Sequence, residues 1–241
     1  MNTLPASQIN TPLKTVLITG ISRGIGKALA QKFLAEGYKV IGTSINGKID
    51  FGHENLTVYK LDLSKPRSIK KCVIKIFKSG VKIDIMHNNA GALFDDEETH
   101  VVIDKLQRTL TVNLFGTIDF TEQMASNINK GGHIINTSSS AGSLTDTDMK
   151  DALTSHFPFH YPSYKISKCA LNMYTRTLAM RLVHEKKEIT VSSVHPGWVR
   201  TDMGGEDAPM LPAEAADWIY KLAISKPETG CFWFKGEKYP W

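Results

Sequence analysis

The chain has 241 residues, of which 41% are hydrophobic and 22% are charged, a balance typical of a globular protein with a sizeable core. The formal net charge is +5, but the lysines and arginines are scattered along the chain, which argues against a nucleic-acid-binding protein. No apolar stretch has the ~18–20 residues of a membrane span, and three scattered cysteines indicate neither a metal site nor disulfides, so we expect a soluble cytoplasmic protein.

Residues 1–12 combine neither a basic start nor an apolar run, so we expect a flexible extension rather than a secretory signal. From residue 13 to residue 241, short runs of apolar and β-branched residues alternate with longer segments of helical spacing. The predicted strands are 15–19, 39–43, 56–61, 83–87, 133–137, 189–194 and 230–234. The predicted helices are 26–36, 68–79, 104–128, 163–185 and 213–224.

Several predicted strands are almost wholly apolar, which is typical of strands that are buried on both faces of a sheet. The alternation therefore predicts an α/β fold with a single Rossmann-type domain over 13–241. Its doubly wound parallel sheet would have about seven strands, with helices on both faces. Ligands of such sheets bind beyond the carboxyl ends of the strands, so candidate functional residues should directly follow the strands.

The turn after the first predicted strand has the sequence TGISRGIG and leads directly into a helix. Glycines permit a close approach of the backbone, and the free N–H groups at a helix start attract phosphate. Such a turn also occurs for purely structural reasons, but its place after the first strand of an alternating chain favours a dinucleotide. The predicted contacts are Gly20, Ser22, Arg23, Gly24, Ile25 and Gly26.

The end of the second predicted strand bears on which dinucleotide binds. NAD sites usually carry an acidic residue there, which holds the ribose 2′-hydroxyl. Residues 37–49 contain no Asp or Glu, and Arg23 is placed to pair with a 2′-phosphate. We therefore predict NADP(H), with Ser44 in the site and NAD(H) less favoured. The alternative, in which Arg23 faces water and either cofactor is accepted, stays open.

Two further strand ends carry candidate cofactor residues. Asp62 and Leu63 follow the third strand, where Asp62 either accepts from the adenine amino group or caps the next helix. The fourth strand ends in Asn89, Ala90 and Gly91, whose small size lets a flat cofactor lie across the sheet edge, although an ordinary turn has the same composition.

Tyr164 and Lys168 lie four residues apart and therefore share one face of a predicted helix. An ammonium about 4 Å from a phenol, at an effective dielectric near 20, favours the phenolate by roughly 4 kcal/mol, or about three pKa units. Tyr164 would then act as a general acid in carbonyl reduction and as a base in the reverse reaction. In isolation, packing together with a solvated amine explains such a pair more often than catalysis does.

Three other segments support the same chemistry. Ser139 follows the fifth strand, where its hydroxyl is placed to bind a substrate oxygen. Asn113 lies in the middle of a predicted helix, an unfavourable place for Asn, which indicates either a bound water that serves the lysine or a side chain facing solvent. The backbone after the sixth strand is expected to meet the nicotinamide amide, with a hydroxyl reaching the phosphates; these residues are Pro196, Gly197, Val199 and Thr201.

Taken together and in this order, TGISRGIG, NNAG, VNLFG, SSAG, YKISK and HPGWVRTDMGG resemble the short-chain dehydrogenase/reductase family over about residues 14–241. HPGWVRTDMGG and the ending GEKYPW look like the carbonyl reductases of the C-factor and sniffer type. The resemblance implies an NADP-dependent enzyme that reduces a ketone or aldehyde. It implies that Tyr164 is the acid/base, that Lys168 binds the nicotinamide ribose and lowers the tyrosine pKa, and that Asn113 completes the relay.

The resemblance also assigns the family serine to Ser139, with Ser138 and Ser140 as alternatives. The segment 143–160, which precedes the Tyr164 helix, is longer than in most of the family. Phe157 and Phe159 in it, together with Trp198, suggest an apolar or ring-bearing substrate; a homodimer or homotetramer is compatible with the family. Two other functions stay open: a dinucleotide-binding regulatory protein of C-factor type with little turnover, and an NAD-dependent alcohol dehydrogenase.

Overall fold

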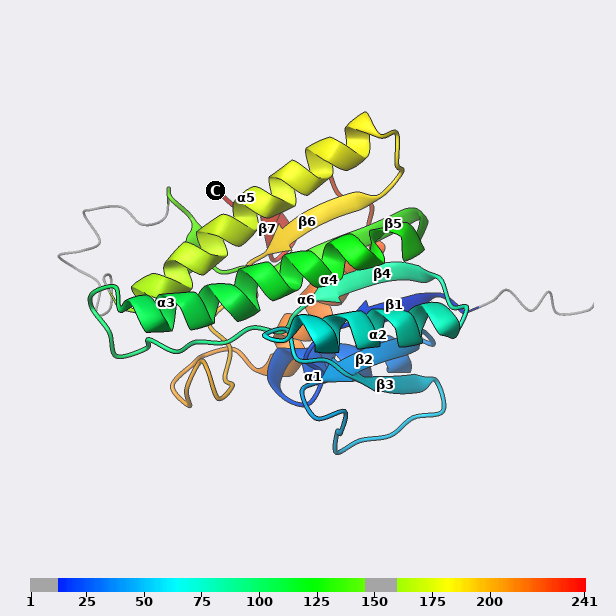
Figure 1. The fold of residues 1–241 in the computed structure, drawn as a ribbon, viewed down its shortest axis with the longest axis horizontal. Helices are drawn as coiled ribbons and strands as arrows, with labels where there is room; N and C mark the ends of the chain where they lie inside the picture. Colours follow the sequence, from blue (N-terminus) through cyan, green and yellow to red (C-terminus); the bar gives the residue numbers. More distant parts are fainter. Residues whose placement is uncertain (1–12, 146–159) are drawn as a thin grey trace, which may run out of the picture.

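The structure is a computed structural model that describes residues 13–145 and 160–241 (Figure 1). Eight strands form one sheet in the order β3-β2-β1-β4-β5-β6-β7-β8. Their bounds are β1 (Thr15–Ile18), β2 (Lys39–Ser44), β3 (Leu56–Lys60), β4 (Ile83–Asn88), β5 (Ile128–Thr137), β6 (Thr190–Val194), β7 (Cys231–Phe234) and β8 (Glu237–Lys238). The first seven strands pair in parallel, which confirms the predicted α/β fold with a doubly wound sheet.

The short strand β8 was not predicted, and it pairs with β7 in antiparallel orientation. The two residues between these strands, Lys235 and Gly236, have φ angles of 48° and 87°. Positive φ at both central residues is the geometry of a two-residue hairpin turn, which accounts for the reversal of direction.

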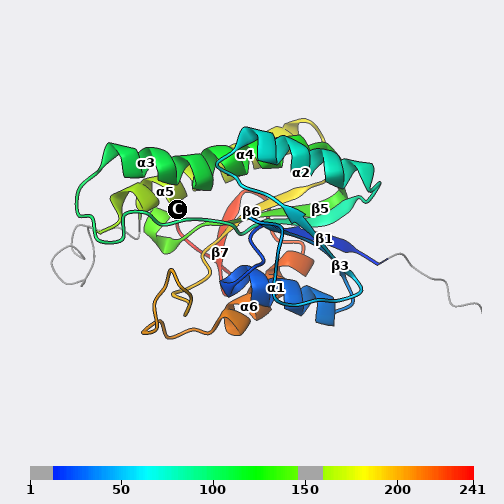
Figure 2. The ribbon, with the colours of Figure 1, turned by 60° about the horizontal axis from the view of Figure 1, so that its bottom comes forward.

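The helices cover both faces of the sheet, and Figure 2 shows α1 and α6 on one face and α2, α3, α4 and α5 on the other. Their bounds are α1 (Gly24–Ala35), α2 (Pro66–Lys78), α3 (Ile103–Leu110), α4 (Thr117–Met124), α5 (Pro162–His184) and α6 (Pro212–Ile224). The described residues also contain one π-helical turn, η1 (Thr111–Gly116), and two short 3-10 turns, η2 (Ala125–Asn127) and η3 (Ser140–Gly142). Among the described residues, no helix is both long and apolar enough to cross a membrane.

The prediction of one continuous helix over 104–128 is wrong in two respects. The six residues of η1 form a π-helical turn between α3 and α4, and the strand β5 already begins at Ile128. The π-turn ends at Gly116, which passes so close to the chain after β3 that a Cβ atom there would lie 2.0 Å from the Leu63 carbonyl oxygen. The early start of β5 extends its pairing to Ile83 on β4, across an irregular register.

The core lies in two layers, one on each side of the sheet. Leu17 and Ile134 face α2, α4 and α5, whereas their chain neighbours Ile18 and Ile135 face α1 and α6. All four side chains are fully buried. Because consecutive residues of a strand point to opposite faces, a sheet covered on both sides needs continuous apolar runs, and this explains the strand sequences.

Candidate active site

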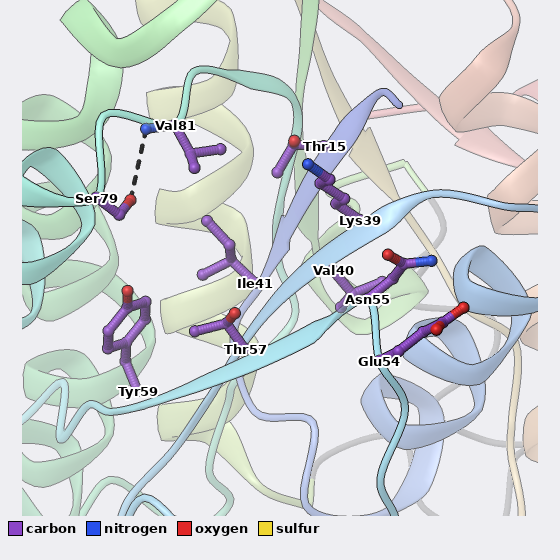
Figure 3. A pocket seen from close by; sticks show the side chains of 10 residues that line it. All are labelled: Thr15, Lys39, Val40, Ile41, Glu54, Asn55, Thr57, Tyr59, Ser79 and Val81. Carbon is purple, nitrogen blue, oxygen red and sulfur yellow. Dashed lines mark hydrogen bonds between the residues drawn. The ribbon is translucent and has the colours of Figure 1, made fainter. Parts of the chain in front are cut away.

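A cleft of about 1360 Å³ opens beyond the carboxyl ends of the parallel strands. It is lined by the segments that follow β1, β2, β3, β4, β5 and β6. A second hollow, of about 230 Å³, lies at the amino-terminal side of β1 and β2 and is lined by residues of these strands, of β3 and of the turn after α2 (Figure 3). Only the larger cleft lies at the edge where parallel α/β sheets bind their ligands.

Most of the predicted cofactor residues line the large cleft. They are Gly20, Ser22, Arg23, Gly24, Ile25, Gly26, Ser44, Asp62, Leu63, Asn89, Ala90, Gly91, Tyr164, Lys168, Pro196 and Thr201. Gly197 and Val199 do not line it. Gly197 packs against Met210, whose Cε atom would lie 2.8 Å from an added Cβ, and Val199 is 3% exposed and forms a β-bridge with Met210.

The glycine turn after β1 has the geometry expected of a turn that binds phosphate groups. Gly20 and Gly24 have φ angles of 74° and 57°, which residues with a side chain rarely adopt. A Cβ atom on Gly26 would lie 2.2 Å from the Gly20 carbonyl oxygen, so only glycine lets α1 begin so close to β1. In the described chain no side chain caps α1, and its first turn contains no acidic residue, so its positive end is free to meet an anion.

The side chain of Asn89 ties the end of β4 to this turn. Its amide nitrogen donates to the carbonyl oxygens of Thr19 and Gly20 at 3.0 and 3.3 Å. In return, the Thr19 hydroxyl accepts from the backbone N–H groups of Asn89 and Ala90, at 3.0 Å each. The turn and the strand end therefore form one fixed surface, which fits the flat cofactor expected there.

Three predicted cofactor residues are also held by their neighbours. The Arg23 guanidinium lies 3.0 Å from the Asp202 carboxylate, and both side chains are largely exposed. The hydroxyl of Ser44, a buried residue, donates to the Lys48 carbonyl oxygen at 2.9 Å. Asp62 does not cap α2, since Lys65 is the N-cap residue. The Asp62 carboxylate accepts a hydrogen bond from the Ser64 backbone N–H at 3.0 Å, and Asp62 lines the cleft.

Tyr164, Ser139 and Lys168 come together where α5 passes the end of β5. The Ser139 side chain lies beside the Tyr164 phenol and acts to lower its pKa, and the Lys168 ammonium lies 5.3 Å from the centre of the Tyr164 ring. The same ammonium donates to the Thr137 carbonyl oxygen at 2.8 Å. The Ser138 hydroxyl instead donates to the Lys168 backbone, at 3.3 Å, so Ser139 is the serine that meets the tyrosine.

Burial dominates the protonation of this pair. It raises the pKa of Tyr164 to about 12, although the Ser139 side chain opposes the shift. It lowers the pKa of Lys168 to about 8. The net shift of the Tyr164 pKa is upward, opposite in direction to the lowering expected from Lys168, because loss of solvent is its largest cause.

Asn113 does not face solvent, because it is 2% exposed and lies in the π-turn η1. Its side chain makes two 2.8 Å hydrogen bonds with Ala92, one accepted from the backbone N–H and one donated to the carbonyl oxygen. It also donates to the Ser167 hydroxyl at 3.1 Å. A Cβ atom added to Gly91 would lie 3.5 Å from the Asn113 oxygen and 3.6 Å from the Lys168 nitrogen, so both groups border the same space.

One wall of the cleft was not predicted. It consists of Phe94 and a face of the helix that begins with α3, namely Asp104, Gln107, Arg108 and Thr111. The Arg108 guanidinium lies 4.3 Å from the centre of the Phe94 ring. The spacing i, i+3, i+4, i+7 of these polar helix residues is the signal in the sequence, but a solvated helix face has the same spacing.

The predicted aromatic contribution to the cleft is supported less well. Trp198 does not line the cleft, and its indole N–H donates to the Gly204 carbonyl oxygen at 2.7 Å on the surface. Phe157 and Phe159 lie outside the described residues.

Comparison with known families gives a match to the model of the short chain dehydrogenase family over residues 14–211. One similar protein is 1-hydroxy-2-glutathionyl-2-methyl-3-butene dehydrogenase of Rhodococcus sp. (strain AD45), which is 27% identical over 225 residues, or 90% of this chain and 94% of that protein. Carbonyl reductase [NADPH] 1 of Mus musculus is 26% identical over 256 residues, which cover 88% of this chain and 91% of the mouse protein.

Solved structures show the same fold over nearly the whole chain. The NADPH-bound carbonyl reductase from chicken fatty liver superposes with a TM-score of 0.82 at 26% identity and covers 95% of this chain and 94% of its own. A short-chain dehydrogenase/reductase from Burkholderia multivorans with bound NADP has a TM-score of 0.80 at 27% identity and covers 95% and 100%. The carbonyl reductase Sniffer of D. melanogaster, at 24% identity, has a TM-score of 0.79 over 95% of this chain and 100% of its own.

Proposed function

This chain belongs to the short chain dehydrogenase family, and we propose that it is an NADP-dependent oxidoreductase that reduces the carbonyl group of a ketone or aldehyde. The observation that carries the proposal is the position of Tyr164 and Lys168 on the cleft that also holds the glycine turn, with the Lys168 ammonium 5.3 Å from the centre of the phenol ring and the Ser139 side chain beside the phenol. The names of the mouse and chicken relatives, both NADPH-linked carbonyl reductases, support the same reaction.

The glycine turn, the uncapped start of α1 and the fixed surface around Asn89 fit a dinucleotide. Arg23 would hold the 2′-phosphate, in exchange for its contact with Asp202. The acid-free end of β2, at Ser44, favours NADP(H) over NAD(H). When bound, NADPH supplies the hydride.

The residues of this chain supply the proton and hold the carbonyl oxygen. Ser139 and Tyr164 both present hydroxyl groups, which suit an oxygen that becomes negative during reduction. A tyrosine with a pKa of about 12 holds its proton at neutral pH, so Tyr164 donates only when a more basic oxygen forms beside it. The ammonium of Lys168 then stabilises the phenolate that remains. Asn113 links the segment after β4 to α5 through its hydrogen bonds with Ala92 and Ser167.

Replacement of the tyrosine tests the proposal directly. Tyr164→Phe removes the proton donor without changing the ring, so kcat/KM for carbonyl reduction should fall about 10²–10⁴-fold. The Kd of NADPH should change by less than about twofold. The reaction is followed as the loss of NADPH absorbance with a panel of ketones and aldehydes, which also finds the preferred substrate.

The chain offers a matched control in Tyr161, whose ring packs edge-on against the Tyr164 ring, with 6.2 Å between the two ring centres. Tyr161→Phe should keep the activity of the unaltered protein. Normal turnover by Tyr164→Phe would contradict the proposed role, and NADPH binding by the unaltered protein with no reduction of any carbonyl would favour a regulatory protein.

A further inference from the structure

Asp95 is a buried carboxylate at the start of the helix that carries Tyr164 and Lys168. It lies in the segment between β4 and α3 and is 1% exposed. One carboxylate oxygen accepts from the backbone N–H of Ser163 at 2.6 Å, and the other has no hydrogen-bond partner among the described residues. A carboxylate without any hydrogen bond is very unfavourable in the interior. The hydrogen bond with the Ser163 amide therefore contributes strongly to the stability of this arrangement.

The helix α5 begins without a capping side chain of its own. Its N-cap residue is Tyr161, a residue with φ of 47° whose side chain makes no capping hydrogen bond, and Pro162 follows. The first N–H groups of a helix need acceptors from elsewhere. Here the segment from β4 to α3 supplies two: the Asp95 carboxylate for Ser163, and the Glu98 carbonyl oxygen for Tyr161 at 2.9 Å.

The same segment also holds the other side of the candidate active site. Ala92, close before Asp95, makes both hydrogen bonds with Asn113. Asn113 donates to the Ser167 hydroxyl, which in turn donates to the Tyr164 carbonyl oxygen at 2.7 Å. Figures 1 and 2 show the first turns of α3 and α5 side by side beyond the sheet, where this segment joins them.

We propose that Asp95 is a positioning residue for the reaction: by binding the Ser163 amide, it fixes the first turn of α5 and thereby places the Tyr164 hydroxyl against Ser139. Tyr164 directly follows Ser163, so a shift of the first turn moves the phenol with it. The inference rests on the proposed function, since the placement of Tyr164 matters for turnover only if Tyr164 takes part in it. Small misplacements of a reacting group reduce rates strongly, by up to about 10²-fold for 1 Å.

The test compares two variants of Asp95. Asp95→Ala removes the acceptor and should lower kcat at least about tenfold, while the Kd of NADPH changes by less than about twofold. Asp95→Asn keeps an oxygen that can accept from the Ser163 amide and should recover most of kcat. Should Asp95→Ala not accumulate as folded protein, Asp95→Ser replaces it, because the shorter side chain does not reach the amide.

Asp84 provides the matched control, because it lies at the amino-terminal end of β4, away from the cleft at the carboxyl ends of the strands. Its carboxylate also accepts from a backbone N–H, that of Thr15, at 2.7 Å. Asp84→Ala should therefore lower the stability without lowering kcat. The inference is wrong if Asp95→Ala retains the kcat of the unaltered protein, if Asp95→Asn fails to recover it, or if Asp84→Ala loses as much.

Amide hydrogen exchange of residues 163–166, read by mass spectrometry, tests the hydrogen bond without any substrate. Exchange should be faster in Asp95→Ala than in the unaltered protein and in Asp95→Asn. Equal exchange in all three would overturn the positioning role. An unaltered protein that reduces no carbonyl would contradict the proposed function, and the exchange experiment would still decide whether Asp95 fixes α5.

Discussion

Lys168 carries its charge in an unfavourable place, because only 3% of its surface is exposed. Burial lowers its pKa from near 10.5 to about 8, so the unfolded chain binds more protons than the folded chain between these two pH values. The folded state therefore loses stability as the pH falls from about 10.5 through about 8. For an isolated group the loss is about 3 kcal/mol, since one pKa unit corresponds to about 1.4 kcal/mol.

Lys168→Met removes this proton linkage. The free energy of unfolding of the variant, relative to that of the unaltered protein, should be larger at pH 7 than at pH 10, by up to about 3 kcal/mol. Urea unfolding at the two pH values measures the difference. Lys71→Met, at an exposed position of α2, should show the same relative stability at both. A Lys168→Met difference that does not change with pH would show that the ammonium is not desolvated.

The residues themselves were easier to predict than their electrostatic environment. Helical spacing put Tyr164 and Lys168 on one face, the ordered motifs singled them out, and the structure places both on the cleft. The predicted direction of the tyrosine shift assumed a charge in contact with the phenol, whereas the structure places the ammonium on the Thr137 carbonyl and encloses both groups. Asp95 was not singled out, because its role depends on Ser163, which is distant in sequence and contacts it only in the folded chain.

At the scale of elements, the seven parallel strands were predictable because each is an apolar run bounded by turn residues, and their parallel pairing follows from the alternation with helices. The helix over 104–128 was not, because a π-turn has no periodicity of its own that differs clearly from a helix. It lies at a tertiary contact, the close passage of Gly116 over Leu63, which the sequence does not reveal. Such turns often occur at functional sites, and this one contains Asn113.

Gly116→Ala tests whether this contact sets the path of the helix. The added Cβ atom would lie 2.0 Å from the Leu63 carbonyl oxygen, so either the helix or the chain after β3 must move. We expect a loss of about 2–4 kcal/mol in the free energy of unfolding, measured with urea. Gly52→Ala, at an exposed glycine where an added Cβ atom meets no atom within 4 Å, should be nearly neutral. Equal stability of the two variants would contradict the importance of the contact.

At the scale of the whole molecule, the cleft joins segments from both halves of the sheet. The glycine turn follows β1, and the loop with Asp202 follows β6; they meet at the Arg23–Asp202 ion pair. A ligand in the cleft therefore contacts parts of the chain that are far apart in sequence. Because only folding brings these parts together, such a ligand binds the folded state and not the unfolded one. Such a ligand stabilises the fold by about 2.7 kcal/mol when its concentration is a hundred times Kd.

We predict that NADPH raises Tm by roughly 5–10 °C at that saturation, since 1 kcal/mol corresponds to about 2–4 °C for a chain of this size. NADH at the same concentration should raise Tm less, because it has no 2′-phosphate to pair with Arg23. Arg23→Ala should reduce the NADPH shift towards that of NADH. Asp202→Asn should increase it slightly, because an exposed carboxylate competes for the guanidinium by no more than about 1 kcal/mol.

Thermal unfolding with each nucleotide, recorded for the unaltered protein and the two variants, separates the contributions. If Arg23→Ala reduced the NADPH and NADH shifts equally, Arg23 would contact the part that both nucleotides share, and the acid-free end of β2 would be the remaining support for NADP(H). If NADH stabilised the unaltered protein as much as NADPH, the preference itself would be wrong, because neither Arg23 nor Ser44 would then distinguish the two nucleotides.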